Sequence, residues 1–164
     1  MDKALFFMST IIIVVLIWVS QEEFQTWDQQ RQLLKAANNR AVHRAMLVST
    51  NSNEGRFIIS PETARKAYDE ALQRNLGLTS SFQPKTGSPV FSELRVLYFE
   101  IIDDTTGQSF PFLYDNPDYH LTKTIRGPAV IAVIEMDYPA LVQRIRNPEP
   151  MQIPTIYEYV TESL

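Results

Sequence analysis

The chain has 164 residues, of which 45% are hydrophobic and 21% charged, a balance typical of a chain that folds around one core. Its formal net charge is −4, and it has no block of five Lys or Arg residues. This excludes nucleic acid as an expected partner, because phosphate backbones bind positive surfaces. No cysteine is present, so disulfides, thiolate nucleophiles and cysteine-based metal sites are excluded together.

Residues 4–19, ALFFMSTIIIVVLIWV, form an apolar run without a charge. As a helix the run is about 24 Å long at ~1.5 Å per residue, which is short but usable for crossing a membrane if the interfacial Trp18 helps to complete the span. A buried core helix would carry polar residues at every turn, whereas this run has only Ser9 and Thr10. A signal peptide cleaved after Ser20 is the stronger alternative, although Trp18 then occupies a position that requires a small residue. We expect a retained anchor.

The orientation of the anchor follows from a small difference in positive charge. Lys3 and the α-amine precede the run, and Arg31 and Lys35 follow it at a distance. A three-residue tail with a positive end is easily kept in the cytoplasm. The expected arrangement is a single-pass membrane protein with a cytoplasmic N-terminus and an extracytoplasmic C-terminal domain.

The segment that follows the run, residues 21–50, contains no Gly or Pro and predicts a stem helix that continues the anchor. Leu34, Ala37, Ala41, Ala45 and Val48 recur at helical spacing and form a narrow apolar stripe. The stripe packs on the chain's own downstream domain, or it lets neighbouring subunits approach closely. For the second interpretation, the predicted subunit contacts are Ser9, Ile13, Leu34, Ala37, Ala41 and Ala45.

Residues 51–164 predict a small domain whose clearest element is a helix over residues 60–77. The Ser60 side chain is expected to cap the free N–H groups of its first turn, Pro61 fits that turn, and Gly77 is suited to a left-handed end. NSNEG at 51–55 is expected to end the stem with a turn, and RFII at 56–59 is a strand candidate.

Beyond residue 90 the pattern changes to β-branched and aromatic runs separated by turn residues. The expected strands are residues 94–102, 109–114, 119–125, 129–136 and 153–160. Their short connections predict antiparallel neighbours, Pro154 predicts an edge position for the last strand, and residues 139–146 predict a short helix. The predicted fold class is therefore α+β: a transmembrane helix over residues 1–20 runs on into the stem helix, which packs with a second helix on an antiparallel sheet.

Two acidic clusters, Asp103-Asp104 and Asp115-Asn116-Pro117-Asp118, invite a calcium or catalytic interpretation. Both fall where hairpin turns are needed, and neither has the length of a calcium loop, so turns are the preferred interpretation. No phosphate-binding loop, nucleophile elbow or His-Glu metal helix occurs in the sequence. We therefore expect no enzymatic activity, no cofactor, no metal and no small-molecule substrate.

The apolar run followed by QQRQLLKAANNRAVHRA resembles the N-terminal part of TadE-like and other type IV pilin-like proteins. In those proteins a membrane helix runs on into a Gln- and Ala-rich stem that packs on a small sheet. No Gly precedes the run here and no Glu lies early inside it, so no residue of the family's processing motif is carried over.

The resemblance implies a minor pilin or pseudopilin-like component of a pilus or secretion apparatus at the cell surface. Its partners would be membrane lipid and other pilin-like or secretion subunits. The alternative is a membrane-tethered extracytoplasmic binding or sensor domain that acts alone.

Overall fold

The computed structural model describes residues 2–53, 56–138 and 150–159, and it confirms the α+β class. The elements in chain order are α1 (Asp2–Ser49), β1 (Thr50–Asn53), β2 (Arg56–Ile59), α2 (Pro61–Leu76), β3 (Leu94–Ile102), β4 (Phe112–Asn116), the short 3₁₀ helix η1 (Pro117–Tyr119), β5 (Leu121–Ile125), β6 (Ala129–Met136) and β7 (Met151–Glu158).

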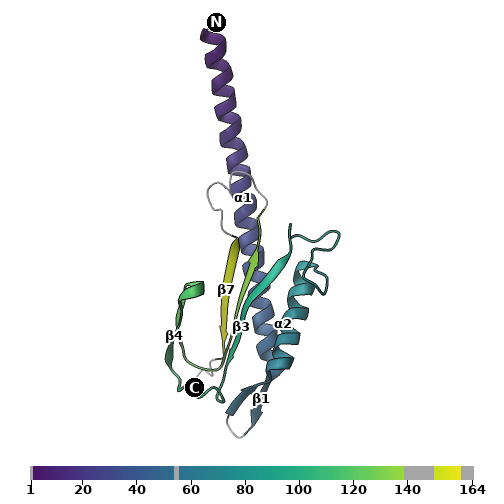
Figure 1. The fold of residues 1–164 in the computed structure, drawn as a ribbon, viewed down its shortest axis with the longest axis vertical. Coiled ribbons are helices and arrows are strands. Elements are labelled where there is room, and N and C mark those ends of the chain that lie inside the picture. Colours follow the sequence, from purple (N-terminus) through teal and green to yellow (C-terminus); the bar gives the residue numbers. More distant parts are fainter. Residues whose placement is uncertain (1, 54–55, 139–149, 160–164) are drawn as a thin grey trace, which may run out of the picture.

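Helix α1 is one unbroken rod of 48 residues, about 72 Å long at ~1.5 Å per residue. Its first half projects from the molecule, and its second half lies along the small domain beside the antiparallel α2 (Figure 1). The predicted continuity of anchor and stem is confirmed, since the helix does not end at residue 20. No hinge therefore separates the apolar half of α1 from the half that packs on the domain.

The central layer is a three-stranded antiparallel sheet in the order β3–β6–β7. Strand β6 is buried along its whole length, which its continuous apolar sequence AVIAVIEM requires of a strand covered on both faces. Its even-numbered residues, such as Ala132 and Ile134, join the core cluster formed with α1 and α2. Its odd-numbered residues Ala129 and Ile131 join a second cluster on the other face.

The second face of the sheet is covered by a separate hairpin of β4 and β5. The prediction that short connections make antiparallel neighbours is confirmed for β4 and β5, but it was wrong for β3 and β4 and for β5 and β6, which lie in different sheets. The hairpin brings Tyr114 and Ile125 onto Ile131 and so buries the apolar outer face of the central strand. Covering this face of β6 is therefore more favourable than hydrogen bonding each strand to the strand that precedes or follows it in the chain.

The expected turn after α1 is a second small hairpin, because β1 pairs with β2 in antiparallel register. Helix α2 begins and ends where predicted, and Gly77 takes the left-handed conformation with φ 63°. Ser60 occupies the N-cap position, but its hydroxyl donates to Thr63 Oγ1 rather than accepting a backbone N–H, so the predicted side-chain cap was wrong. The edge position of β7 is confirmed, and the helix predicted at 139–146 lies outside the described residues.

Candidate functional site: the exposed half of the first helix

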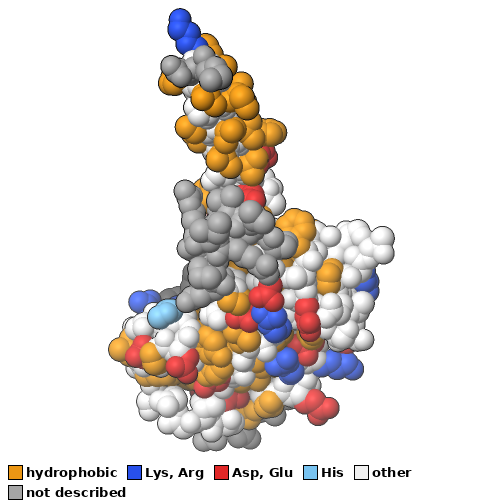
Figure 2. Space-filling view, turned by 45° about the horizontal axis from the view of Figure 1, so that its top comes forward, with side chains coloured by type: hydrophobic (Ala, Val, Ile, Leu, Met, Phe, Trp, Pro, Cys, Tyr) orange, Lys and Arg blue, Asp and Glu red, His pale blue; other side chains and the backbone are white. Residues whose placement is uncertain are grey.

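The first half of α1 carries a sheath of apolar side chains that the domain does not cover (Figure 2). Every large apolar side chain from Leu5 to Val19 is exposed, from 37% at Val19 to 67% at Phe6. Leaving one such side chain in water forgoes about 1.5–3 kcal/mol relative to burying it. A continuous apolar surface on this scale requires an apolar environment or a protein partner.

The two polar side chains within the sheath satisfy their own hydrogen bonds. The hydroxyls of Ser9 and Thr10 both donate to the carbonyl oxygen of Phe6, at 2.8 and 2.9 Å. A hydroxyl bonded back to its own helix can enter a lipid environment without an unpaired donor. Helix α1 is thus long and apolar enough near its N-terminus to cross a membrane, and the apolar window has no buried residue.

The other four predicted contact residues lie elsewhere. Leu34, Ala37, Ala41 and Ala45 are 0–3% exposed, and they belong to the core cluster that α1 forms with α2 and the sheet. Of the two interpretations of the stripe, packing on the chain's own domain is confirmed. These side chains present no surface to a neighbouring subunit, whereas Ser9 and Ile13 remain exposed on the projecting half. Val48, which also belonged to the stripe, is 43% exposed.

A buried amide at Asn38 fixes the position of α1 on the domain. Its Nδ2 donates to the carbonyl oxygens of Ile153 at 2.9 Å and Ala132 at 3.4 Å, and its Oδ1 accepts from the Tyr68 hydroxyl at 2.7 Å. Burial raises the pKa of Tyr68, so this hydroxyl keeps its proton and acts as a donor. Sequence reasoning missed this site, although an Asn flanked by stripe residues is a signal of a buried polar contact.

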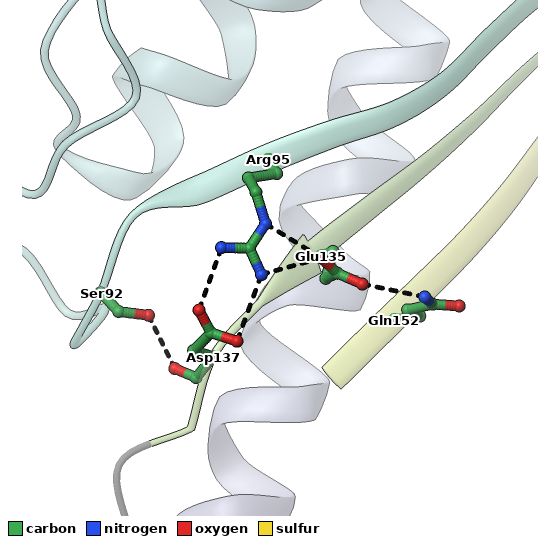
Figure 3. Close-up of polar contacts among 5 residues, drawn as sticks. All are labelled: Ser92, Arg95, Glu135, Asp137 and Gln152. Carbon is green, nitrogen blue, oxygen red and sulfur yellow. Dashed lines mark hydrogen bonds and ion pairs between the residues drawn. The ribbon is translucent and has the colours of Figure 1, made fainter. Parts of the chain in front are cut away.

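A charged row crosses the sheet at the end that faces the projecting half of α1 (Figure 3). The Arg95 guanidinium contacts Glu135 Oε1 at 2.8 Å and Asp137 Oδ2 at 3.0 Å, and Gln152 donates to Glu135 Oε2 at 2.9 Å. The hydrogen bonds that Arg95 donates to Asp137 and Glu135 raise the pKa of Arg95. Since these charges bind one another, the row connects three strands and offers no unpaired charge to a ligand.

Two tyrosines and a carboxylate fasten the β4–β5 hairpin to the sheet. The hydroxyls of Tyr98 and Tyr114 both donate to Glu100 Oε2, at 2.6 and 2.7 Å. Desolvation, together with this carboxylate, raises the pKa of Tyr98, so its proton stays on the phenol. The arrangement is a closed set of bonds that holds the hairpin in place.

The first acidic cluster holds a turn and also binds the neighbouring hairpin. Asp103 Oδ2 accepts the N–H of Ile59 at 2.9 Å, its Oδ1 accepts the N–H of Thr105 at 2.8 Å, and Asp104 Oδ2 accepts the N–H of Phe57 at 2.7 Å. Desolvation acts to raise the pKa of Asp103, but the bonds from Ile59 and Thr105 together lower it. Both carboxylates therefore accept backbone N–H groups, and Asp103 Oδ1 also accepts the Thr105 hydroxyl at 2.6 Å.

The second cluster forms the end of β4 and the turn of η1, where Asp115 Oδ1 accepts from the Thr122 hydroxyl at 2.7 Å. Over the described ranges, no three His, Asp or Glu side chains come together in a way that could hold a metal ion. The preferred turn interpretation holds for Asp103-Asp104 and for Pro117-Asp118, whereas Asp115 and Asn116 are paired residues of β4.

Comparison with known proteins found no match: no family model, no curated protein and no solved structure matches this chain.

Proposed function

We propose that the protein is a membrane-anchored, non-enzymatic structural or assembly subunit, of the minor pilin or pseudopilin kind, in a pilus or secretion apparatus. One observation supports it above all. The exposed apolar half of α1 and the helix that forms the core of the domain are a single rod without a hinge. A subunit built this way transmits the position of its membrane segment directly to its domain.

In this proposal α1 crosses the membrane once, with the N-terminus in the cytoplasm and the domain outside it. Its partners are membrane lipid and other subunits of the apparatus. The side chains left for subunit contact are those of the projecting half, of which Ser9 and Ile13 are the proposed contact positions. Ile13 lies about 40° around the helix from Ser9, so the two residues share one face.

The test uses single cysteines, which the cysteine-free sequence makes unambiguous. Ser9→Cys and Ile13→Cys are compared with Ile11→Cys, which lies within the same apolar run but about 160–200° away around the helix. In membranes from the producing cells, oxidative cross-linking is expected to give a dimer or a mixed product at positions 9 and 13, and much less at 11.

Two results would contradict the proposal. If a carbonate wash releases the full chain from the membrane, the proposed anchorage is contradicted. A helix held by apolar burial stays in the membrane, because that burial is not weakened when charges are screened. Absence of any cross-linked product at all three positions in a membrane-bound, folded chain would instead favour the alternative, a tethered binding or sensor domain that acts alone.

A further inference from the structure

The end of the domain that faces the projecting half of α1 carries a group of aromatic side chains, here called the collar: Phe24, Trp27, Phe91 and Tyr138. Phe24 stacks on Trp27 with ring centroids 6.3 Å apart, and Phe91 meets Tyr138 edge to face at 6.0 Å. The side chain of Tyr138 lies beside Thr26, one residue before Trp27, so the two pairs are neighbours. The collar therefore consists of two rings on α1 and two rings on the domain, at the end of the domain from which the projecting half of α1 extends.

Phe91 is held in its exposed position by bonds on both sides. Gln30 Nε2 donates to the carbonyl oxygen of Pro89 at 2.8 Å, and the Ser92 hydroxyl donates to the carbonyl oxygen of Asp137 at 2.6 Å. The neighbouring Val90 is 4% exposed, whereas Phe91 is 52% exposed. The fold thus fixes an aromatic ring at the surface instead of burying it, which is typical of a surface that meets an apolar or interfacial partner.

The height of the collar along α1 matches a lipid interface. A bilayer has about 30 Å of hydrocarbon and is about 40–45 Å thick with its headgroups. If residues 4–19 are centred in it, the hydrocarbon ends near residue 21 and the headgroup layer extends to about residue 25. Phe24 then lies about 19 Å from the bilayer centre, within the headgroup layer, and Trp27 lies about 23 Å from it, just beyond a half-thickness of about 20–22.5 Å. The bond between Gln30 and Pro89, with the contact between Phe91 and Tyr138, places Phe91 beside the outer limit of this layer.

We propose that the collar rests in the headgroup layer of the membrane that α1 crosses, so that the lipid surface itself is a partner of the domain. This inference rests on the proposed membrane anchorage but not on the proposed assembly. Trp27 and Tyr138 carry rings with a polar group, which are favoured at this depth. The collar is separated from the apolar sheath by only four polar residues, Ser20-Gln21-Glu22-Glu23. The domain is then held on the bilayer at a fixed tilt.

The charges of this region indicate which lipid property is recognised. Residues 20–31 of α1 contain three acidic side chains, Glu22, Glu23 and Asp28, and one basic side chain, Arg31, whose guanidinium lies 5.9 Å over the Trp27 ring. The acidic side chains are therefore in excess. Attraction to anionic lipid requires Lys or Arg at the surface, so the contact made here depends on the aromatic rings. Zwitterionic phosphatidylcholine is expected to be sufficient.

The experiment places a single environment-sensitive fluorophore on the full chain in phosphatidylcholine vesicles. Phe91→Cys is compared with Leu113→Cys, whose site on β4 is apolar and 66% exposed but lies on the hairpin over the other face of the sheet. Ile13→Cys reports on the anchor. We expect a blue shift and quenching by headgroup-nitroxide lipid at position 91, quenching by mid-chain nitroxide at position 13, and neither at position 113.

The outcomes separate the two proposals. Quenching at 13 without quenching at 91 overturns the collar and leaves the anchor standing. Absence of quenching at 13 overturns the anchorage and the collar with it. Equal quenching at positions 91 and 113 would show that the domain contacts the membrane on more than its collar end. That result would contradict the inference. If adding phosphatidylserine greatly increases the quenching at position 91, the domain is attracted by lipid charge, and this result would also contradict the inference.

Discussion

The amide of Asn38 is the residue on which the relation between helix and domain depends most directly. It is buried in the middle of α1 and contacts α2 and two strands at once, through Tyr68, Ala132 and Ile153. Without these bonds the side-chain amide of Asn38 and the hydroxyl of Tyr68 would be buried without a partner. Losing one side of such a bond costs more than the bond contributes, because the remaining group stays desolvated.

We predict that Tyr68→Phe lowers the free energy of unfolding by about 1–3 kcal/mol, because Oδ1 of Asn38 is left without a donor. Asn38→Leu is expected to cost at least as much. The double variant is expected to cost less than the sum of the two, with a coupling energy of about 0.5–3 kcal/mol. Urea unfolding measures all three. Tyr157→Phe, in which no bonded hydroxyl is lost, is the control. If the losses of stability in the two single variants simply add in the double variant, the hydrogen bond between Tyr68 and Asn38 is contradicted.

Asp103 shows how a residue chosen from the sequence as a turn former can have a second task. Its carboxylate is 2% exposed and accepts N–H groups from both its own turn and β2. The composition of the turn predicted the first of these contacts, since Asp bonds its own backbone nearby. The second contact joins residues 44 positions apart, and no local pattern encodes that.

We predict that Asp103→Asn lowers the free energy of unfolding by about 1.5–3 kcal/mol at pH 7, since an amide replaces a carboxylate that accepts backbone donors. The exposed Asp118→Asn makes the same charge change and is expected to stay within about 0.5 kcal/mol of the wild type.

The pH dependence gives a second check on Asp103. The pKa of Asp103 in the folded state lies below its ordinary value of 3.8, so the folded protein binds fewer protons than the unfolded chain. Its contribution to stability is full above about pH 5 and is lost as the pH falls through the folded pKa. The difference between wild type and Asp103→Asn should shrink over that range, and a constant difference would count against the carboxylate.

At the scale of elements, strong local signals predicted the helices and most strands, and long-range packing decided the rest. Helix α2 and strand β6 agree with the sequence within a residue, because caps and uninterrupted apolar runs are local features. The order of the strands in the sheet could not be predicted from local signals. Strand β6 needs a cover on both faces, and the β4–β5 hairpin provides one, so neighbours in the chain are not neighbours in the sheet.

The small residues of α1 illustrate the same limit at the candidate site. Spacing placed Ala37, Ala41 and Ala45 on one face, but spacing does not say which surface meets that face. In the structure Ala64 and Ala71 of α2 belong to the same core cluster, so small residues from both helices allow the two to approach closely.

We predict that Ala41→Leu lowers the free energy of unfolding by about 1–3 kcal/mol, because the site is fully buried and extra volume must displace its neighbours. Ala36→Leu places the same side chain on the exposed face of the same helix, where the change should stay within about 0.5 kcal/mol. Thermal unfolding of both variants decides the matter. Equal stability of the two would mean that α1 does not pack on the domain as described.

For the whole molecule, the feature that matters is the division of α1 into two environments. Residues before about 20 contribute nothing to the core, whereas Leu34, Ala41, Val42 and Met46 belong to it. The domain therefore has its own core, and its folding should not depend on the apolar sheath.

We predict that a chain shortened to begin at Gln21 is a folded domain in water, since it keeps every residue of both core clusters. Its circular dichroism should show helix and strand, with one cooperative thermal transition.

The midpoint of this transition should be the same with calcium and with EDTA, because the carboxylates of Asp103 and Asp104 already accept backbone N–H groups. A ligand that binds only the folded state would raise the midpoint by mass action. The variant Asp103→Asn serves as the control. If calcium raises the midpoint of the wild-type domain by several degrees and does not raise that of the variant, the acidic turn is a cation site and the preference for a turn is overturned.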